Sequence, residues 1–266
     1  RRAGRRPDGE PPVPRGERLH RQARRLRRPG AAGTAHGARA LSAPTFRQLG
    51  ALALLSQPAI IVVQLAVAAR WEVPFDPTRN TISDLGAVEC GTIRAAYGPV
   101  EVCSPWHAGM NAGFLVVGAL LALGAVLAVP SLASGPATRV AAVRMLVAGV
   151  SSAAVGLVPL DVDGDLHTLV ATLLFATQPP ALLLLGCVAT GRGHRRDGLV
   201  LLVAGVVAAL GAVAFGATLV TGEVGGLHER VALWTCHAGL AVVGWRVLRA
   251  RPTGPGDRAR IWETAA

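Results

Sequence analysis

Residues 199–221 read LVLLVAGVVAALGAVAFGATLVT, an apolar stretch without a single Asp, Glu, Lys or Arg. An α-helix rises 1.5 Å per residue, so about 20 apolar residues cross the ~30 Å hydrocarbon core of a bilayer. Lipid offers the backbone no hydrogen-bond partner, so a spanning segment satisfies its own peptide groups as a helix. This stretch therefore predicts a membrane-spanning helix.

Five further stretches of similar length and polarity predict five more spans. Only 16% of the chain is charged and 51% is hydrophobic, whereas soluble domains carry about 25% charged residues. We therefore predict an all-α polytopic membrane protein whose six transmembrane helices form a bundle. The expected spans lie near 48–69, 108–129, 140–160, 167–190, 199–221 and 231–248.

The distribution of arginine predicts how these spans are oriented. All 27 basic residues are Arg, which indicates GC-rich bacterial coding. With the amino terminus inside and the residues before 48 left out, ten Arg fall on the inner side and four on the outer side. Basic residues concentrate in cytoplasmic segments. We therefore predict a multi-pass protein of the bacterial plasma membrane with both termini in the cytoplasm.

The chain divides into a domain and two tails. Residues 1–43 are rich in Arg, Gly, Pro and Ala and show no apolar period, so we expect a disordered Arg-rich tail. A six-helix transmembrane domain is expected over 44–250 and a cytoplasmic tail over 251–266. Three interpretations of 1–43 stay open: an over-extended gene start, since no initiator Met is present, a positive-inside anchor, or binding to anionic lipid or nucleic acid.

Several polar residues whose burial in a membrane costs free energy lie at or just below the predicted outer surface. Four separate segments supply them, and ionisable groups at membrane depth usually face the bundle or a wet cavity. We therefore predict an extracytoplasmic polar pocket that binds a lipid headgroup, a small ligand or an envelope partner. The candidate pocket residues are Asn80, Ser83, Asp84, His107, Asn111, Asp161, His167, Glu229, Arg230 and His237.

Two other functions stay open beside this non-enzymatic interpretation. One is a metal-dependent hydrolase or lipid-modifying enzyme in which His167, His237 and either Asp161 or Asp163 hold zinc, because zinc accepts imidazole and carboxylate ligands. No HExxH spacing supports it, so we expect no cofactor. The third is a transporter with acids and His as a proton relay. We expect the lipid bilayer and no nucleic acid as partner of the protein as a whole, and the sequence does not predict an oligomeric state.

A serine nucleophile is a weaker hypothesis. Ser83 with His107 or His167 is the combination that the sequence offers, and no GxSxG elbow supports it. Asp163 and its neighbouring acids are expected to cap the fourth span. For Arg230, a surface pair with Glu229 and a cross-bundle pair with Asp84 or Asp161 both stay open.

The four cysteines divide into two groups. Cys90 and Cys103 fall in the long outer loop 70–107, where an oxidising environment favours a disulfide. Cys187 and Cys236 lie within expected spans and are interpreted as ordinary buried cysteines.

Several short motifs resemble one bacterial membrane family. NTISDLG at 80–86, the two loop cysteines, NAGF at 111–114 and GLHER at 226–230 are similar to the family called domain of unknown function 998. GLVP at 156–159 followed by His167 resembles its third-to-fourth span junction. The resemblance covers about residues 45–250. It implies a six-helix membrane domain and brings no established activity.

Overall fold

The computed structural model describes residues 45–221, 225–250 and 261–263. Within them, six segments are long and apolar enough to cross a membrane, which confirms the predicted number of spans. The predicted tail 1–43 lies outside the described residues, and so does the predicted tail 251–266 apart from 261–263. The helices are α2 (Phe46–Leu55), α3 (Ala59–Ala68), α4 (His107–Leu127), α5 (Pro136–Leu157), α6 (Gly164–Gly191), α7 (Arg195–Thr221) and α8 (Gly226–Arg249).

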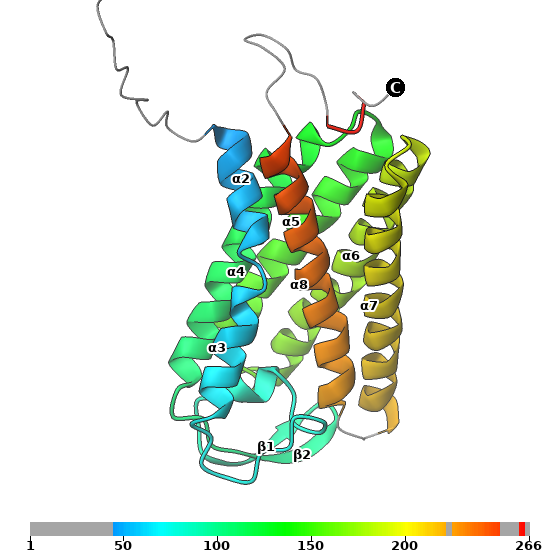
Figure 1. Ribbon diagram of the computed structural model, residues 1–266. Coiled ribbons are helices and arrows are strands. Elements are labelled where there is room, and N and C mark those ends of the chain that lie inside the picture. The colour runs from blue at the N-terminus through cyan, green and yellow to red at the C-terminus, as the bar shows by residue number, and fades with distance from the viewer. Residues whose placement is uncertain (1–44, 222–224, 251–260, 264–266) are drawn as a thin grey trace, which may run out of the picture. The chain divides into compact units, whose positions relative to one another are not determined.

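The six spans, the first of which comprises α2 and α3, form a ring in which consecutive spans pack against each other (Figure 1). The ring closes because α2 contacts both α4 and α8. Glycines bring α4 and α5 close together: a Cβ added at Gly118 would lie 2.5 Å from the Gly149 carbonyl oxygen, and one at Gly149 would lie 2.7 Å from the Gly118 carbonyl oxygen. Such close backbone approach is how helices pack in lipid, where no hydrophobic force holds them together.

The first span is broken, although the sequence predicted a continuous helix over 48–69. It divides into α2 and α3 at 56–58, where Pro58 lacks the N–H that a continuing helix needs. The side chain of Gln57 is fully buried and donates from Nε2 to the Val117 carbonyl at 3.1 Å. The non-helical residues at the break are therefore buried against the interior of the bundle, where non-helical backbone at membrane depth is tolerated.

One end of the bundle, which we call the loop end, carries the long segment between α3 and α4. It contains the 3-10 helix η1 (Ser83–Gly86) and an antiparallel hairpin of β1 (Gly91–Ala95) and β2 (Gly98–Val102), which the sequence analysis did not predict. The predicted disulfide between Cys90 and Cys103 is confirmed and closes the base of this hairpin. Cys187 and Cys236 are free thiols; Cys236 is buried as predicted, whereas the prediction was wrong for Cys187, which is exposed on the outer face of α6.

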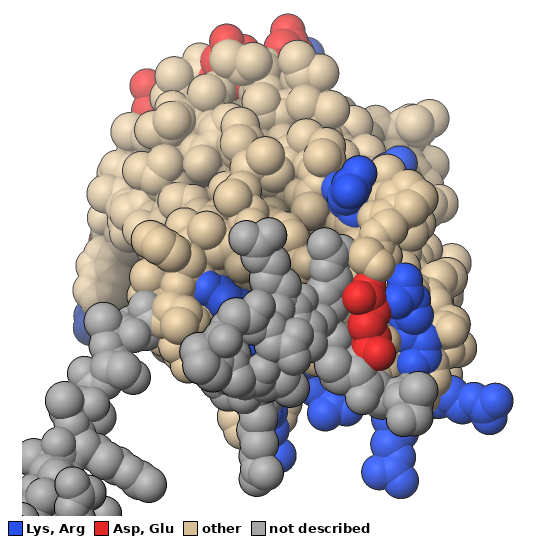
Figure 2. All heavy atoms as spheres, turned by 90° about the horizontal axis from the view of Figure 1, so that it is seen from above, with Lys and Arg blue, Asp and Glu red and all other residues tan. Residues whose placement is uncertain are grey.

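The opposite end, which we call the arginine end, is where α2 begins and α8 ends. Figure 2 looks onto it and shows blue Arg side chains gathered over part of its surface. Asp197 and Arg246 form an ion pair there at 2.5 Å. By the positive-inside rule, the end with more arginine lies in the cytoplasm. The side of the membrane on which each end lies stays a prediction. Arg side chains at this end belong to Arg47, Arg139, Arg144, Arg192, Arg195, Arg196, Arg246 and Arg249.

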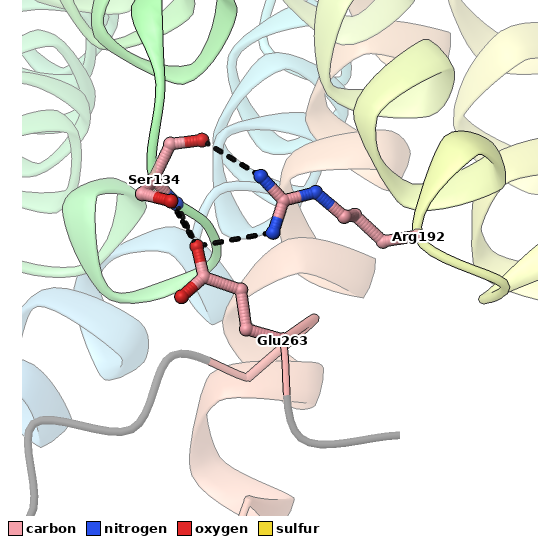
Figure 3. Close-up of polar contacts among 3 residues, drawn as sticks. All are labelled: Ser134, Arg192 and Glu263. Carbon is pink, nitrogen blue, oxygen red and sulfur yellow. Dashed lines mark hydrogen bonds and ion pairs between the residues drawn. The ribbon is translucent and has the colours of Figure 1, made fainter. Parts of the chain in front are cut away.

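Residues 261–263 return to the arginine end and dock there. The backbone N–H of Trp262 donates to the Leu132 carbonyl at 2.8 Å, and the Trp262 side chain is buried. The Glu263 carboxylate accepts from the backbone and hydroxyl of Ser134 and pairs with Arg192 at 3.1 Å (Figure 3). The bonds from Ser134, and then Arg192, lower the pKa of Glu263. This segment therefore ties the chain terminus to the turns after α4 and α6.

Candidate functional site

A rigid turn at the loop end places Ser83. The backbone N–H of Thr81 donates to Asp84 Oδ2 at 2.8 Å, and the backbone N–H of Asp84 donates to Thr81 Oγ1 at 3.1 Å. These reciprocal bonds resemble a helix capping box and fix the backbone on both sides of Ser83. The side chain of Ser83 is half-buried at the start of η1, so it is held firmly and still accessible.

Two buried side chains, the carboxyl group of Asp84 and the phenol of Tyr97, hold this turn in place. Tyr97, at the tip of the hairpin, donates its hydroxyl to Asp84 Oδ1 and lies 3.0 Å from Thr81 Oγ1. Burial raises the pKa of Asp84, and burial together with the Asp84 charge raises the pKa of Tyr97 well above its ordinary value. The phenol therefore keeps its proton and serves as a permanent donor to the carboxyl group. The sequence analysis missed Tyr97, which carries no motif around it.

Glu229 of α8 holds the same turn from the bundle side. Its carboxylate accepts the backbone N–H of Ile82, the residue before Ser83, and its side chain is buried. Ile82 is fully buried as well. A residue of the last span thus fixes the backbone next to Ser83, and Glu229 also lines the cavity described below.

Arg230 anchors the loop through backbone carbonyls. Its Nη1 donates to the carbonyls of Pro77 at 2.8 Å, Asn80 at 2.6 Å and Gly226 at 3.0 Å. Within the described residues the ion pairs are Arg192 with Glu263 and Arg246 with Asp197. Neither pairing considered for Arg230 is therefore formed within the described residues, and its Nη1 donates to backbone carbonyls instead.

His167 meets Ser83 at the start of α6. Its Nε2 lies 2.9 Å from Ser83 Oγ, and its Nδ1 lies 2.7 Å from the Val158 carbonyl oxygen. A carbonyl only accepts, so Nδ1 carries the proton, and in the neutral ring Nε2 is left as an acceptor for the Ser83 hydroxyl. The structure thus brings together the serine and one of the two histidines that the sequence analysis named as its weaker hypothesis.

The pair stands at the polar end of a cavity of about 270 Å³ that runs between α6 and α7. Phe175 of α6 and Phe215 of α7 both line it and contact each other, with ring centroids 5.3 Å apart. Its rim includes Thr172, Ala176 and Val213, which are exposed on the bundle surface, so the cavity opens sideways toward the position of lipid tails. The polar lining residues at its end are Thr81, Ser83, Tyr97, His167 and Glu229.

Three predicted site residues serve the loop rather than the cavity. Asn111 donates from Nδ2 to the Gly86 carbonyl at 2.8 Å. Asp161 Oδ2 accepts the backbone N–H groups of Val88 and Glu89 at 2.7 and 2.8 Å. The side-chain oxygen of Asn80 accepts the backbone N–H of Asp76 at 2.9 Å. These side chains position the segment that carries Ser83.

The histidines at 107 and 237 lie apart from the Ser83 cavity. His107 Nδ1 contacts the Ser104 carbonyl at 2.9 Å. His237 lines a second cavity of about 10 Å³ inside the bundle, together with Gln57, Gln64 and Gln178. The sequence analysis missed these three glutamines, although a polar residue inside an apolar stretch is a recognisable signal.

The residues considered for the alternative of a zinc site are not brought together. Among the residues that the structure describes, no group of three or more His, Cys, Asp or Glu side chains is arranged to hold a metal ion. Both ring nitrogens of His167 have other partners, and His237 lines the other cavity. Asp163 instead caps α6, accepting the Leu166 N–H at 3.0 Å, which confirms the capping prediction.

Comparisons with known proteins identify a family and no function. Searches of curated proteins and of solved structures found no match. The family model described as "Protein of unknown function (DUF998)" matches residues 50–246, which include all six spans for most of their length, the Ser83 turn and the cavity. The motifs that suggested this family are those that build the turn and its supports. The chain therefore belongs to the DUF998 family of proteins of unknown function.

Proposed function

We propose that the protein binds a membrane lipid in the cavity between α6 and α7. The acyl chain would lie along the apolar wall, and the ester region of the lipid would lie at Ser83 and His167. The observation that carries this proposal is the single continuous cavity, apolar along two spans and polar at one end, with an exposed rim on the lipid-facing side.

Selection of the ligand rests on the polar end. A chain that moves from the bilayer into the cavity exchanges one apolar environment for another, so it gains packing and little hydrophobic free energy. The half-buried Ser83 hydroxyl can turn from His167 to an acceptor oxygen of the ligand, and a hydrogen bond in such a dry site is stronger than in water. A lipid with acceptor oxygens at the right depth would therefore be preferred over a plain hydrocarbon chain.

We also propose that the loop end faces the outside of a bacterial plasma membrane. Arginine is concentrated at the other end, and an excess of basic residues is typical of cytoplasmic segments. The disulfide between Cys90 and Cys103 at the loop end suits an oxidising compartment. The ligand would then come from the outer leaflet.

A cavity-filling variant tests lipid binding. Gly216 lines the cavity, and a Cβ added there meets no atom within 4 Å, so the side chain of Gly216→Leu starts in open space and should occupy part of the cavity. Gly109→Leu on the exposed face of α4 is the matched control, since a Cβ there also meets nothing. The probe is a phospholipid with a fluorescent acyl chain, added to detergent-purified protein.

We expect saturable binding to the wild type and to Gly109→Leu, and at least a tenfold loss of affinity in Gly216→Leu. Equal binding by all three proteins would overturn the proposal, because the lipid would then be held outside the cavity.

A further inference from the structure

We infer that Ser83 and His167 are a nucleophile and general base that hydrolyse the acyl ester of a bound lipid. The inference rests on the proposed lipid site, whose polar end they form. Ser83 Oγ and His167 Nε2 are 2.9 Å apart, within the range expected between a serine nucleophile and its base. Both residues line the cavity, so a carbonyl carbon at its polar end would reach the hydroxyl.

The acceptor of the Ser83 proton sets this serine apart from others in the bundle. The hydroxyl of Ser104 donates to the Leu85 carbonyl at 2.7 Å, and that of Ser152 donates to the Phe114 carbonyl at 3.2 Å. A backbone carbonyl cannot take up a proton near neutral pH, whereas an imidazole nitrogen can. Ser83 is therefore bonded to a group that can remove its proton during attack.

The Val158 carbonyl takes the place of a third catalytic member. By accepting from Nδ1 at 2.7 Å it fixes the ring orientation and leaves Nε2 facing Ser83. In serine hydrolases a buried carboxylate does this and also stabilises the imidazolium that forms. A neutral carbonyl orients the ring equally well and stabilises the cation less. We therefore expect slower turnover than a full triad supports.

The reaction balances with water as its only co-reactant. Ser83 Oγ forms a bond to the acyl carbon while its proton passes to His167 Nε2. The ester C–O bond breaks, and the leaving alcohol takes the proton from Nε2. Water then attacks the acyl-serine and gives a proton to Nε2. The bond from the acyl carbon to Oγ breaks, and Oγ recovers the proton, so the products are a fatty acid and an alcohol.

The cavity indicates the chemical class of the substrate. Its α6 wall runs from His167 to Ala176, a rise of about 14 Å at 1.5 Å per residue. That length accommodates the first part of a long acyl chain, with the remainder passing the exposed rim into the bilayer. The substrate is therefore a long-chain acyl ester of the leaflet at the loop end.

The test uses a long-chain alkyl fluorophosphonate, which reacts with activated serines, and locates the adduct by mass spectrometry of the full-length protein. We expect one adduct on Ser83 in the wild type, none there in Ser83→Ala, and labelling at least 100-fold slower in His167→Gln. Ser104→Ala and His107→Gln are the matched controls and should be labelled like the wild type. In samples of the same proteins, the rate of fatty-acid release from a fluorescent acyl ester should change between variants in the same way as the rate of labelling.

The outcomes separate this inference from the proposed lipid site. If wild-type protein binds the fluorescent phospholipid but neither reacts with the fluorophosphonate nor releases fatty acid, the hydrolase inference is wrong and the binding site stands. If Ser83→Ala loses reaction and retains lipid binding, both hold. If the wild type does neither, both are wrong. Unchanged labelling in His167→Gln, with thermal unfolding unaltered, would also overturn the role of His167 as base.

Discussion

Ser83 Oγ lies 2.9 Å from His167 Nε2, although 84 positions of sequence separate the two residues. The contact depends on two independent anchors. The turn at 81–84 is closed by its own side chains and held by Glu229, and α6 is capped by Asp163 so that His167 falls in its first turn. A site assembled from three elements in this way is specific to the folded bundle.

Glu229→Ala should loosen the turn that carries Ser83. The substitution leaves the buried N–H of Ile82 without its acceptor, which costs about 2 kcal/mol of unfolding free energy. Glu229→Gln keeps an acceptor oxygen and should recover most of this loss. Thermal unfolding in detergent measures both, with Glu101→Ala on the exposed hairpin as control. An alanine variant as stable as the wild type would show that Glu229 does not support the turn.

The loop disulfide should report on which side of the membrane the loop end lies. In intact cells, a membrane-impermeant maleimide should label neither Cys90 nor Cys103 until an impermeant reductant is added, and then label both. A variant with Cys187 and Cys236 replaced by Ala removes the free thiols from the measurement. Labelling that requires lysis of the cells would place the loop end inside and reverse the predicted orientation.

Two buried glutamines should respond in opposite ways to substitution by Leu. Gln57 Nε2 donates to the Val117 carbonyl across the break between α2 and α3, so Gln57→Leu should lower the unfolding temperature. Neither the Gln178 side-chain nitrogen nor its oxygen has a partner within the described residues, and an apolar replacement removes this penalty. Gln178→Leu should therefore unfold at the wild-type temperature or above it. A clear loss of stability would mean that Gln178 has a partner in the bilayer-embedded protein.

The terminal segment 261–263 should undock in acid. The lowered pKa of Glu263 means that the docked form favours the carboxylate over its protonated form. The carboxylate of Glu263 therefore stabilises docking fully above its ordinary pKa of 4.5, and this stabilisation is lost as the pH falls through the lowered pKa. Hydrogen exchange of the Trp262 amide, which bonds to Leu132, should be slow at neutral pH and faster in acid or in Glu263→Gln. Equal protection in the variant at neutral pH would contradict this account.

Hydropathy predicted the number and the approximate position of the spans, because each requires a long apolar stretch. The expected 108–129 corresponds to α4 at His107–Leu127, for example. The break at 56–58 was missed because hydropathy averages over a window that dilutes one Gln and one Pro. The hairpin was missed because β1 and β2 are only five residues each, so the alternation of Ile93, Arg94 and Ala95 and of Val100, Glu101 and Val102 is too short to stand out in a loop.

The sequence predicted many of the polar residues of the candidate site, but not which of them contact one another. His107 and His167 were equal candidates for a partner of Ser83, since sequence spacing says nothing about which one the loop approaches. The structure selects His167 because the capped start of α6 lies beside η1. Tyr97, the only Tyr in the chain, was invisible because its role depends on a buried contact with Asp84.

The central claim, that an acyl chain lies between α6 and α7, is tested most directly by crosslinking in a reconstituted bilayer. A phospholipid with a photoreactive group on its acyl chain is irradiated with the protein, and adducts are mapped by mass spectrometry. We predict adducts concentrated on the cavity walls around Phe175 and Phe215, and their loss in Gly216→Leu but not in Gly109→Leu. Adducts spread evenly over the outward faces of all the spans, unchanged in Gly216→Leu, would contradict the claim.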